Sequence, residues 1–393
     1  MASEPKIEFL PANHPIQRIN PEVRQKLANA QQNIFPRAFP DALTFTKRVI
    51  DDLKLTLNLP PSLKDKPASD ISDKSFSEVV EFYEPLLQKA GVTGTTLNLH
   101  AINLAQRTQL VRAFEDPDRA VARVTEKVTT IAADFPKSAA DIERGRNPGD
   151  VLDPYILAAT QTLLYKSDFK GAIEATVAHK ALMIIEGLMG HLHEDVIGDM
   201  RGNIRAPEPR GTNQEILDPF TNPFPGADVV QPPTSAGERL RVHQVKSKTG
   251  SAKGGDGKRL GEQLKQLGQY YNAEMFYDAI IGNTLRGHRS MNAVITAAPN
   301  AVVLVGAATF RELTRSPTGP QLLLRVYQNA FAEAARTTGY FIDEMATGIV
   351  ATFRIRSEQA GEGFLELLLR DATGGEQEEQ DSRHYVARRK PNK

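Results

Sequence analysis

The sequence predicts a mixed α/β fold of the α+β kind, in which helices flank a mixed central sheet and a helical region comes first. Three observations indicate this class. Apolar residues recur at helical spacing through most of residues 21–135, β-like runs appear only after residue 225, and long helical stretches lie before and between those runs. The 393 residues, 40% of them hydrophobic, are enough for two packed domains.

The N-terminal third is predicted to be helical. Helices are expected over residues 21–30, 39–57, 75–87, 98–114 and 119–135, with Pro21 in the first turn of one and Asp116 as the cap of another. The best candidate for a domain boundary is the stretch 144–153, which contains Pro148-Gly149. The sequence therefore predicts a helical region for recognition or dimerisation at 1–150, a second domain at 151–375, and a charged tail at 376–393.

The second domain is predicted to carry the strands. A long helix is expected over residues 173–196 and a helical stretch over 259–285. Strands are expected at 228–231, 240–248, 293–297 and 302–305. Thr309 is a candidate helix cap, residues 320–338 read as a helix, and 349–355 with 364–369 read as a closing hairpin.

Composition excludes some classes of function. The chain has 48 Lys and Arg residues and 48 Asp and Glu residues, so no net charge draws the whole molecule to a polyanion. The absence of Cys excludes disulfides and thiolate metal sites. Because no apolar run is long enough to span a bilayer, no membrane partner is expected. The absence of Cys and of a signal-peptide pattern fits the expected cytoplasmic location.

Three polar residues on two neighbouring strand candidates form the most informative pattern. Gln244 and Lys246 are two residues apart on one predicted strand, so their side chains point the same way. Asp228 lies 16 residues before Gln244, across the turn signal Pro232-Pro-Thr-Ser-Ala-Gly237. An antiparallel hairpin would therefore bring Asp228 beside the pair, with His243 pointing away from them.

These residue types suit metal-assisted phosphodiester hydrolysis. Mg²⁺ prefers oxygen ligands and keeps several waters, and Asp228 and Gln244 offer a carboxylate and an amide oxygen. Lys246 is a point charge that orients the attacking water or stabilises the transition state. Glu186 falls inside the apolar stripe of the helix at 173–196, where a carboxylate is costly unless it is paired or bound to a cation.

Asp228, Gln244-Val245-Lys246 and Glu186 resemble the PD-(D/E)XK nuclease superfamily, which includes most restriction endonucleases. The resemblance covers residues 172–267 and implies a helix, a three-stranded meander, a crossover helix and a further strand. It implies Asp228, Gln244 and Glu186 as magnesium ligands and Lys246 as the catalytic lysine. Gln244 stands where the family usually has an acid, so a second carboxylate is needed, from Glu186 or from Glu262 on the next predicted helix.

A basic stretch follows the candidate strand. Residues 239–259 contain seven Lys or Arg residues and one acid. Its members Lys248, Lys253, Lys258 and Arg259 are expected to contact DNA phosphates, and Arg259 could also read a guanine edge.

The sequence thus predicts a magnesium-dependent DNA endonuclease of the type II restriction kind. A homodimer on double-stranded DNA is expected, because two-fold protein symmetry matches a palindromic site. The alternatives are a modification-dependent or defence nuclease, with the N-terminal region as sensor, and a DNA-binding protein that does not cut.

Overall fold

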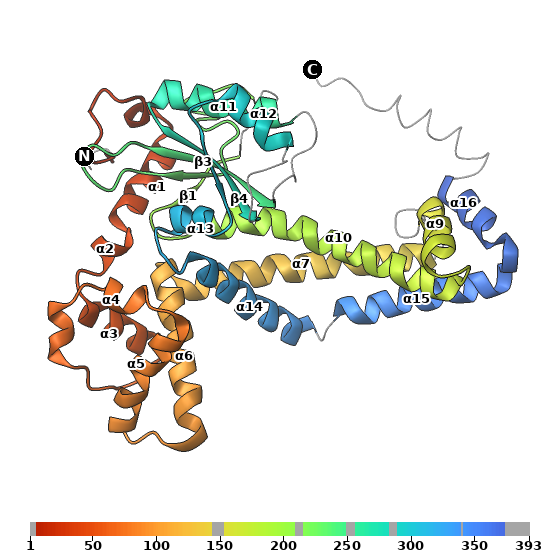
Figure 1. The fold of residues 1–393 in the computed structure, drawn as a ribbon, viewed down its shortest axis with the longest axis horizontal. Coiled ribbons are helices and arrows are strands. Elements are labelled where there is room, and N and C mark those ends of the chain that lie inside the picture. The colour runs from red at the N-terminus through yellow and green to blue at the C-terminus, as the bar shows by residue number, and fades with distance from the viewer. Residues whose placement is uncertain are drawn as a thin grey trace. The chain divides into compact units, whose positions relative to one another are not determined.

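The computed structural model of the chain describes residues 5–143, 153–208, 215–248, 256–282, 289–338 and 341–373 (Figure 1). Contacts divide the chain into two units. Unit 1 comprises residues 1–124 and 190–330, and unit 2 comprises residues 125–189 and 331–393. This division differs from the boundary expected at Pro148-Gly149, which lies outside the described residues, because it places the N-terminal helices in the same unit as the sheet.

The N-terminal part of unit 1 is helical, as predicted. Its elements are η1 (Pro15–Arg18), α1 (Pro21–Gln32), α2 (Phe35–Ala38), α3 (Ala42–Asp52), η2 (Pro61–Asp65), α4 (Ser69–Ser72), α5 (Phe76–Lys89), α6 (Gly94–Ala113) and the start of α7 (Pro117–Glu143). Local chemistry fixes several starts. Asn20 and Asp41 accept hydrogen bonds from the first backbone N–H groups of α1 and α3, and Ser75 and Glu78 form a capping box on α5.

Five strands form one sheet in the order β1-β2-β3-β4-β5. β1 (Ile204–Arg205), β2 (Val229–Gln231) and β3 (Arg241–Lys248) form an antiparallel meander. β4 (Glu274–Ile281) runs parallel to β3, and β5 (Val302–Val305) parallel to β4. The register pairs Val229 with His243 and Gln244 with Tyr277. This mixed sheet flanked by helices confirms the predicted α/β class.

The segment between β3 and β5 differs from the prediction. The helix expected over 259–285 ends at Tyr271, where α11 (Asp256–Tyr271) gives way to β4 after Asn272, whose φ is 47°. The strand expected at 293–297 belongs to α12 (Arg289–Ala297). Most of β4 is buried, so it lacks the alternation of a half-exposed strand, and short apolar runs do not distinguish strand from helix.

Thr309 does not cap a helix. α13 (Ala307–Thr314) begins after Gly306, whose φ is 62°, and Thr309 lies inside it. The Thr309 hydroxyl instead donates to the carbonyl of Ala279 in β4, at 3.2 Å, and so ties α13 to the sheet. The helix predicted at 320–338 is confirmed as α14 (Gly319–Thr338).

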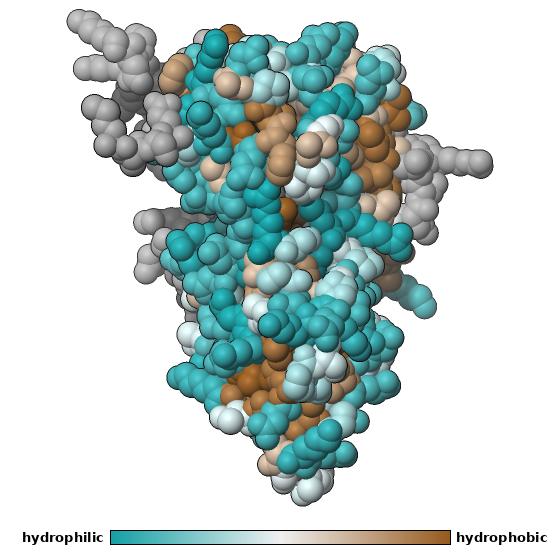
Figure 2. Space-filling view, turned by 90° about the vertical axis from the view of Figure 1, so that its left-hand side faces the viewer, coloured by the Kyte–Doolittle hydropathy of each residue, from teal (hydrophilic) through white to brown (hydrophobic). Residues whose placement is uncertain are grey.

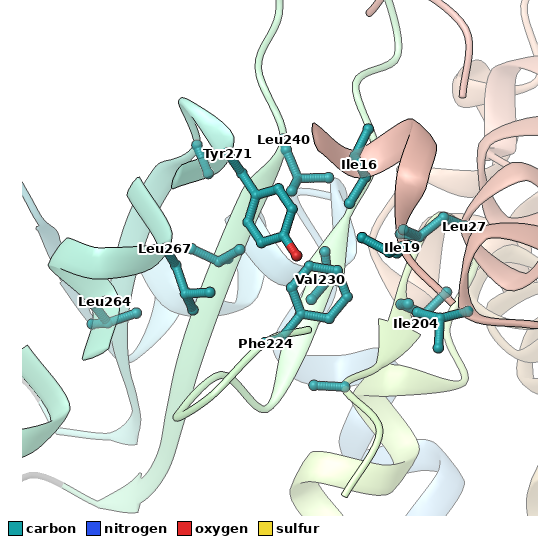
Figure 3. Close-up of a cluster of buried hydrophobic side chains, with 14 of the residues drawn as sticks. Ile16, Ile19, Leu27, Ile204, Phe224, Val230, Leu240, Leu264, Leu267 and Tyr271 are labelled. Carbon is teal, nitrogen blue, oxygen red and sulfur yellow. The ribbon is translucent and has the colours of Figure 1, made fainter. Parts of the chain in front are cut away.

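The sheet and α11 enclose the larger part of the core of unit 1. Leu264, Leu267 and Tyr271 of α11 pack on the face of the sheet that carries Val230 and Val242, together with residues of η1 and α1 (Figure 3). The Tyr271 hydroxyl donates to the carbonyl of Pro223 at 3.0 Å, so its polar end is satisfied inside the core. A second cluster joins α3, α5 and α6 through side chains such as Phe45, Tyr83 and Leu104.

Unit 2 has its own apolar cluster. It contains most of α7 and the end of α14, together with α9 (Pro154–Leu164), the first part of α10 (Phe169–Gly198), α15 (Phe341–Ala360), η3 (Gly361–Gly363) and α16 (Phe364–Thr373). Phe353 and Phe364 are buried among Leu157 and Ile173. The hairpin predicted at 349–355 and 364–369 is therefore wrong, because both runs lie on helices.

The surface fits the balanced composition. Most of the face shown in Figure 2 is hydrophilic, with apolar side chains gathered in separate patches. Within the described ranges, every helix falls short of the combination of length and apolar content that crossing a bilayer requires.

Candidate functional site

Asp228 stands immediately before β2, where it meets β3. The Asp228 N–H donates to the carbonyl of His243 at 2.8 Å, which continues the antiparallel ladder by one residue. One of its carboxylate oxygens, Oδ2, accepts the backbone N–H of Val245 at 2.8 Å and the side-chain Nε2 of Gln244. The expected hairpin is thus confirmed, and it brings Asp228 into direct contact with the Gln244-x-Lys246 strand.

Gln244 and Lys246 share one face of β3 with Val242, whose side chain lies in the core beside α11. Gln244 is buried, at 2% exposed, and Lys246 is half-buried at the end of this face. The neighbouring His243 points to the other face, as predicted. There its Nδ1 lies 2.9 Å from Oδ2 of Asp278, and both side chains are fully buried.

Two acids from the end of α10 lie beside Asp228, and sequence reasoning missed both. Arg205 of β1 connects them: its Nη2 lies 2.6 Å from Oε2 of Glu194, its Nε 3.2 Å from Oδ1 of Asp195, and its Nη1 3.6 Å from Oδ1 of Asp228. The signal available in the sequence was position. Glu194 and Asp195 lie in the last turns of the helix that precedes the first strand, so sequence order alone puts them near the edge of the sheet, although it does not show which way their side chains point.

The carboxyl group of Asp228 is perturbed. Burial raises its pKa from 3.8 to about 7, and the nearby negative charge of Glu194 acts in the same direction. The positive charges of Lys246 and Arg205 and the hydrogen bond from the Val245 N–H act in the opposite direction. A carboxylate that is costly to ionise in this way has a strong tendency to take up either a proton or a cation.

The residues present fit a magnesium ion that keeps most of its water. Oδ1 of Asp228 accepts neither of the hydrogen bonds from β3, and the Gln244 amide that contacts Oδ2 through Nε2 also carries a neutral oxygen, Oε1. Two protein oxygens suffice, because Mg²⁺ is usually held by one or two carboxylates plus waters. A closed cage does not form: among the residues described, no group of three or more His, Cys, Asp or Glu side chains is arranged to hold a metal.

Two carboxylates are expected to compensate for Gln244, and the structure describes the side chain of only one of them. The side chain of Glu186 on α10 lies outside the described part, so its role stays a prediction. Glu262 on α11 is 60% exposed at its side chain and pairs with Lys258, at 3.7 Å. The next residue, Gln263, is the buried one, and it packs against Gly226 in the turn before Asp228. Of the acids that the structure describes, Glu194 has the clearest influence on Asp228.

The expected DNA-binding residues are described only in part. The side chain of Lys248 and the whole of Lys253 lie outside the described residues. Lys258 and Arg259 are exposed at the start of α11, where Arg259 lies 3.4 Å from carboxylate oxygens of both Glu215 and Asp256. Their positive charges are thus partly balanced by neighbouring acids, and exposed pairs of this kind are weak enough to be exchanged for phosphate contacts.

Comparison of the chain with models of known protein families and with curated proteins finds no match.

Proposed function

We propose that this protein is a magnesium-dependent nuclease that hydrolyses phosphodiester bonds in double-stranded DNA, acting as a restriction-type endonuclease of the PD-(D/E)XK kind. One observation carries the proposal. Asp228, immediately before β2, accepts hydrogen bonds from Gln244 and Val245 of β3, and the positive charge of Lys246 acts on the same carboxylate. An acid, an amide and a lysine thus converge where two antiparallel strands meet.

The order of elements supports the same proposal. α10 precedes an antiparallel meander of β1, β2 and β3, α11 crosses over, and β4 returns parallel to β3. This is the order that the resemblance implies. Fold order alone says little about activity, so the residues of the site carry more weight.

Each residue has a chemical role in this proposal. Magnesium, when bound, supplies an activated water and relief of charge on the phosphate. Asp228 holds the cation through a carboxylate oxygen, and Gln244 adds a neutral oxygen. Lys246, half-buried on the same face, orients the attacking water or stabilises the developing negative charge. Glu194 helps to keep the electrostatic environment of Asp228 favourable to a cation.

The test is cleavage of large, mixed-sequence genomic DNA, both unmethylated and methylated, in Mg²⁺ or in chelator. The wild-type protein should produce discrete fragments only with Mg²⁺. Asp228→Ala and Lys246→Ala should each lower cleavage by at least about 100-fold while DNA binding in a gel-shift assay is kept. Lys265→Ala, on the exposed side of α11, is the matched control and should cut normally.

The same assay separates the alternatives. Cleavage of methylated DNA alone would support a modification-dependent nuclease over a restriction enzyme. Normal binding with no cleavage of either DNA would overturn the nuclease proposal in favour of a non-cutting DNA-binding protein. The proposed homodimer predicts twice the monomer mass of 43.2 kDa in sedimentation equilibrium.

A further inference from the structure

Arg205 has an unusual position in the candidate site. Its guanidinium contacts three carboxylates at three different distances: Glu194 at 2.6 Å, Asp195 at 3.2 Å and Asp228 at 3.6 Å. Its Nη1 also donates to the backbone carbonyl of Asp228, at 3.3 Å. The two acids of α10 therefore bind this side chain closely, whereas the carboxylate of Asp228 is held more loosely.

The backbone holds Arg205 in this place. Arg205 of β1 pairs with Val229 of β2. Because Asp228 directly precedes Val229, this pairing fixes Arg205 next to Asp228. On the other side, Gly198 of α10 meets Arg205 directly, because a Cβ on this glycine would lie 2.7 Å from the Cα of Arg205. A helix with any larger residue at 198 could not approach as closely. The side chain of Arg205 is only 26% exposed.

We propose that Arg205 is a positioning residue that acts as the internal counter-cation of the site. It binds Glu194 and Asp195 tightly, so that these acids do not turn toward a cation held by Asp228. The looser contact, to Asp228, is the one that a divalent cation replaces. This inference depends on the proposed function in one respect, namely that Asp228 takes a divalent cation.

Charge explains the expected effect of removing Arg205. Without it, three acids face one another, with Lys246 as a counter-charge to Asp228, and like charges in a partly buried site repel strongly. A divalent cation would then relieve this repulsion as well as bind Asp228. A variant lacking the guanidinium should be less stable in chelator and should respond more strongly to added cation than the wild-type protein.

The test is thermal unfolding in chelator and across a Ca²⁺ titration, with no DNA present. In chelator, Arg205→Gln should melt several degrees below wild type. Added Ca²⁺ should restore most of the lost melting temperature, and the Ca²⁺ concentration at the midpoint of this effect should be at least about tenfold lower than for wild type. Arg241→Gln is the matched control. Arg241 is buried to a similar extent and also bridges two acids, Glu274 and Glu312, but it belongs to the opposite face of β3.

Arg205→Lys covers the case in which Arg205→Gln does not fold. An ammonium cannot contact three carboxylates in the manner of a planar guanidinium. The Ca²⁺ midpoint of Arg205→Lys should therefore lie between those of wild type and Arg205→Gln. If only Arg205→Lys folds, its Ca²⁺ midpoint should lie below that of wild type. A Ca²⁺ midpoint of the Arg205 variants at or above that of wild type would overturn the inference. So would an equal gain in Arg241→Gln.

The readout keeps this inference separate from the nuclease proposal. If Arg205→Gln responds more strongly to Ca²⁺ than wild type does, while the wild-type protein cuts no DNA, the result would support the role of Arg205 and refute the nuclease proposal. Magnesium-dependent cleavage by wild type, together with a Ca²⁺ response identical in Arg205→Gln and Arg241→Gln, would refute the role of Arg205 alone.

Discussion

Asp228 uses its two carboxylate oxygens differently. Oδ2 accepts hydrogen bonds from β3, and Oδ1 faces Arg205 at 3.6 Å. One oxygen therefore fixes the side chain while the other is available for exchange between a guanidinium and a metal ion. This asymmetry is a property of a single side chain, and it predicts what an uncharged replacement of the same shape would do.

Asp228→Asn should abolish stabilisation by divalent cations without lowering stability in chelator. The Asn side-chain oxygen still accepts the Val245 N–H, and the repulsion from Glu194 is removed. The measurement is the melting temperature at pH 8 with chelator and with Mg²⁺. Asp218→Asn, in a loop where the side chain accepts backbone N–H groups, is the control and should keep the Mg²⁺ response. A Mg²⁺ response kept in Asp228→Asn would argue against Asp228 as a ligand.

Spacing alone predicted part of this site. The two-residue spacing of Gln244 and Lys246, which puts both side chains on one face of a strand, and the turn before that strand were enough to place Asp228 beside the pair. Glu194 and Arg205 could not be found in this way, because their contact depends on how α10 approaches β1. That approach is set by Gly198, and the spacing of charged residues does not show it.

At the scale of elements, the turn before β2 orients Asp228. Gly226 has a φ of 74°, and a Cβ at this position would lie 2.9 Å from Cδ of Gln263 on α11. The backbone conformation therefore favours glycine here, and the Gln263 side chain would have to move to admit a larger residue. The turn thus couples the position of the first site residue to the crossover helix.

Gly226→Ala should destabilise the protein by about 1–3 kcal/mol and reduce cation binding, because the left-handed backbone is strained with a Cβ and either the turn or the Gln263 side chain must move. Gly237→Ala is the control. Gly237 has a φ of 89°, but a Cβ added there would meet no atom within 4 Å, so its substitution tests the backbone strain without the steric clash. Urea unfolding of both variants gives the comparison. Equal losses of unfolding free energy in the two variants would show that the Gln263 side chain moves aside at little cost and that the contact with α11 is unimportant.

His14 links η1 to the end of α11 and predicts a pH dependence. Its Nδ1 accepts the Ile16 N–H at 3.2 Å, so its Nε2 carries the proton and donates to the carbonyl of Tyr271 at 2.8 Å. Burial lowers the pKa of His14 below its ordinary 6.5. The unfolded chain then binds the proton more readily, so this stabilisation is complete above pH 6.5 and is lost as the pH falls below it.

His14→Asn keeps an acceptor for the Ile16 N–H but cannot titrate. The difference in unfolding free energy between wild type and His14→Asn should therefore shrink as the pH is lowered from 8 to 5. Urea unfolding at several pH values measures it. A difference that stays constant over this range would mean that the folded and unfolded states bind the His14 proton equally.

The element predictions failed where burial removes the periodic signal. β1, β2 and β3 have clear turns or polar residues around them, and the last two were predicted. β4 is a central strand with neighbours on both sides, and its run Phe276–Ile280 is apolar except for Asp278, so it continues the pattern of α11 without a break. The apolar runs on α15 and α16 look like strands in isolation because strand and helix share residues such as Ile, Phe and Leu.

At the scale of the whole molecule, the two units differ in what they contain. Unit 1 holds the sheet, the candidate site and two apolar clusters, whereas the cluster of unit 2 comes from four helices. Local stability follows local burial, so we expect unit 2 to open at a lower free energy than the sheet.

Phe353→Ala should show this difference. Phe353 is fully buried in unit 2, and its truncation should cost about 3–5 kcal/mol in that cluster. Hydrogen exchange should speed up in α9 and α16 while protection of β3 and β4 is kept. Leu267→Ala, in the cluster beside the sheet, is the reciprocal variant and should weaken β3 and β4. Loss of protection throughout the chain in both variants would mean that the two units unfold together.

The described residues of the candidate site all lie between residues 194 and 246. Glu194 and Arg205 are 11 residues apart, and Asp228 and Gln244 are 16 apart. Closing loops this short is entropically cheap and fast, whereas joining β4 to β3 requires the whole of α11 to be in place. During folding the chemistry should therefore be assembled before the sheet is complete, and pulse-labelled hydrogen exchange should find the Val245 amide protected earlier than those of β5. A nascent chain that has emerged only as far as β3 would already carry every described residue that the proposed reaction needs.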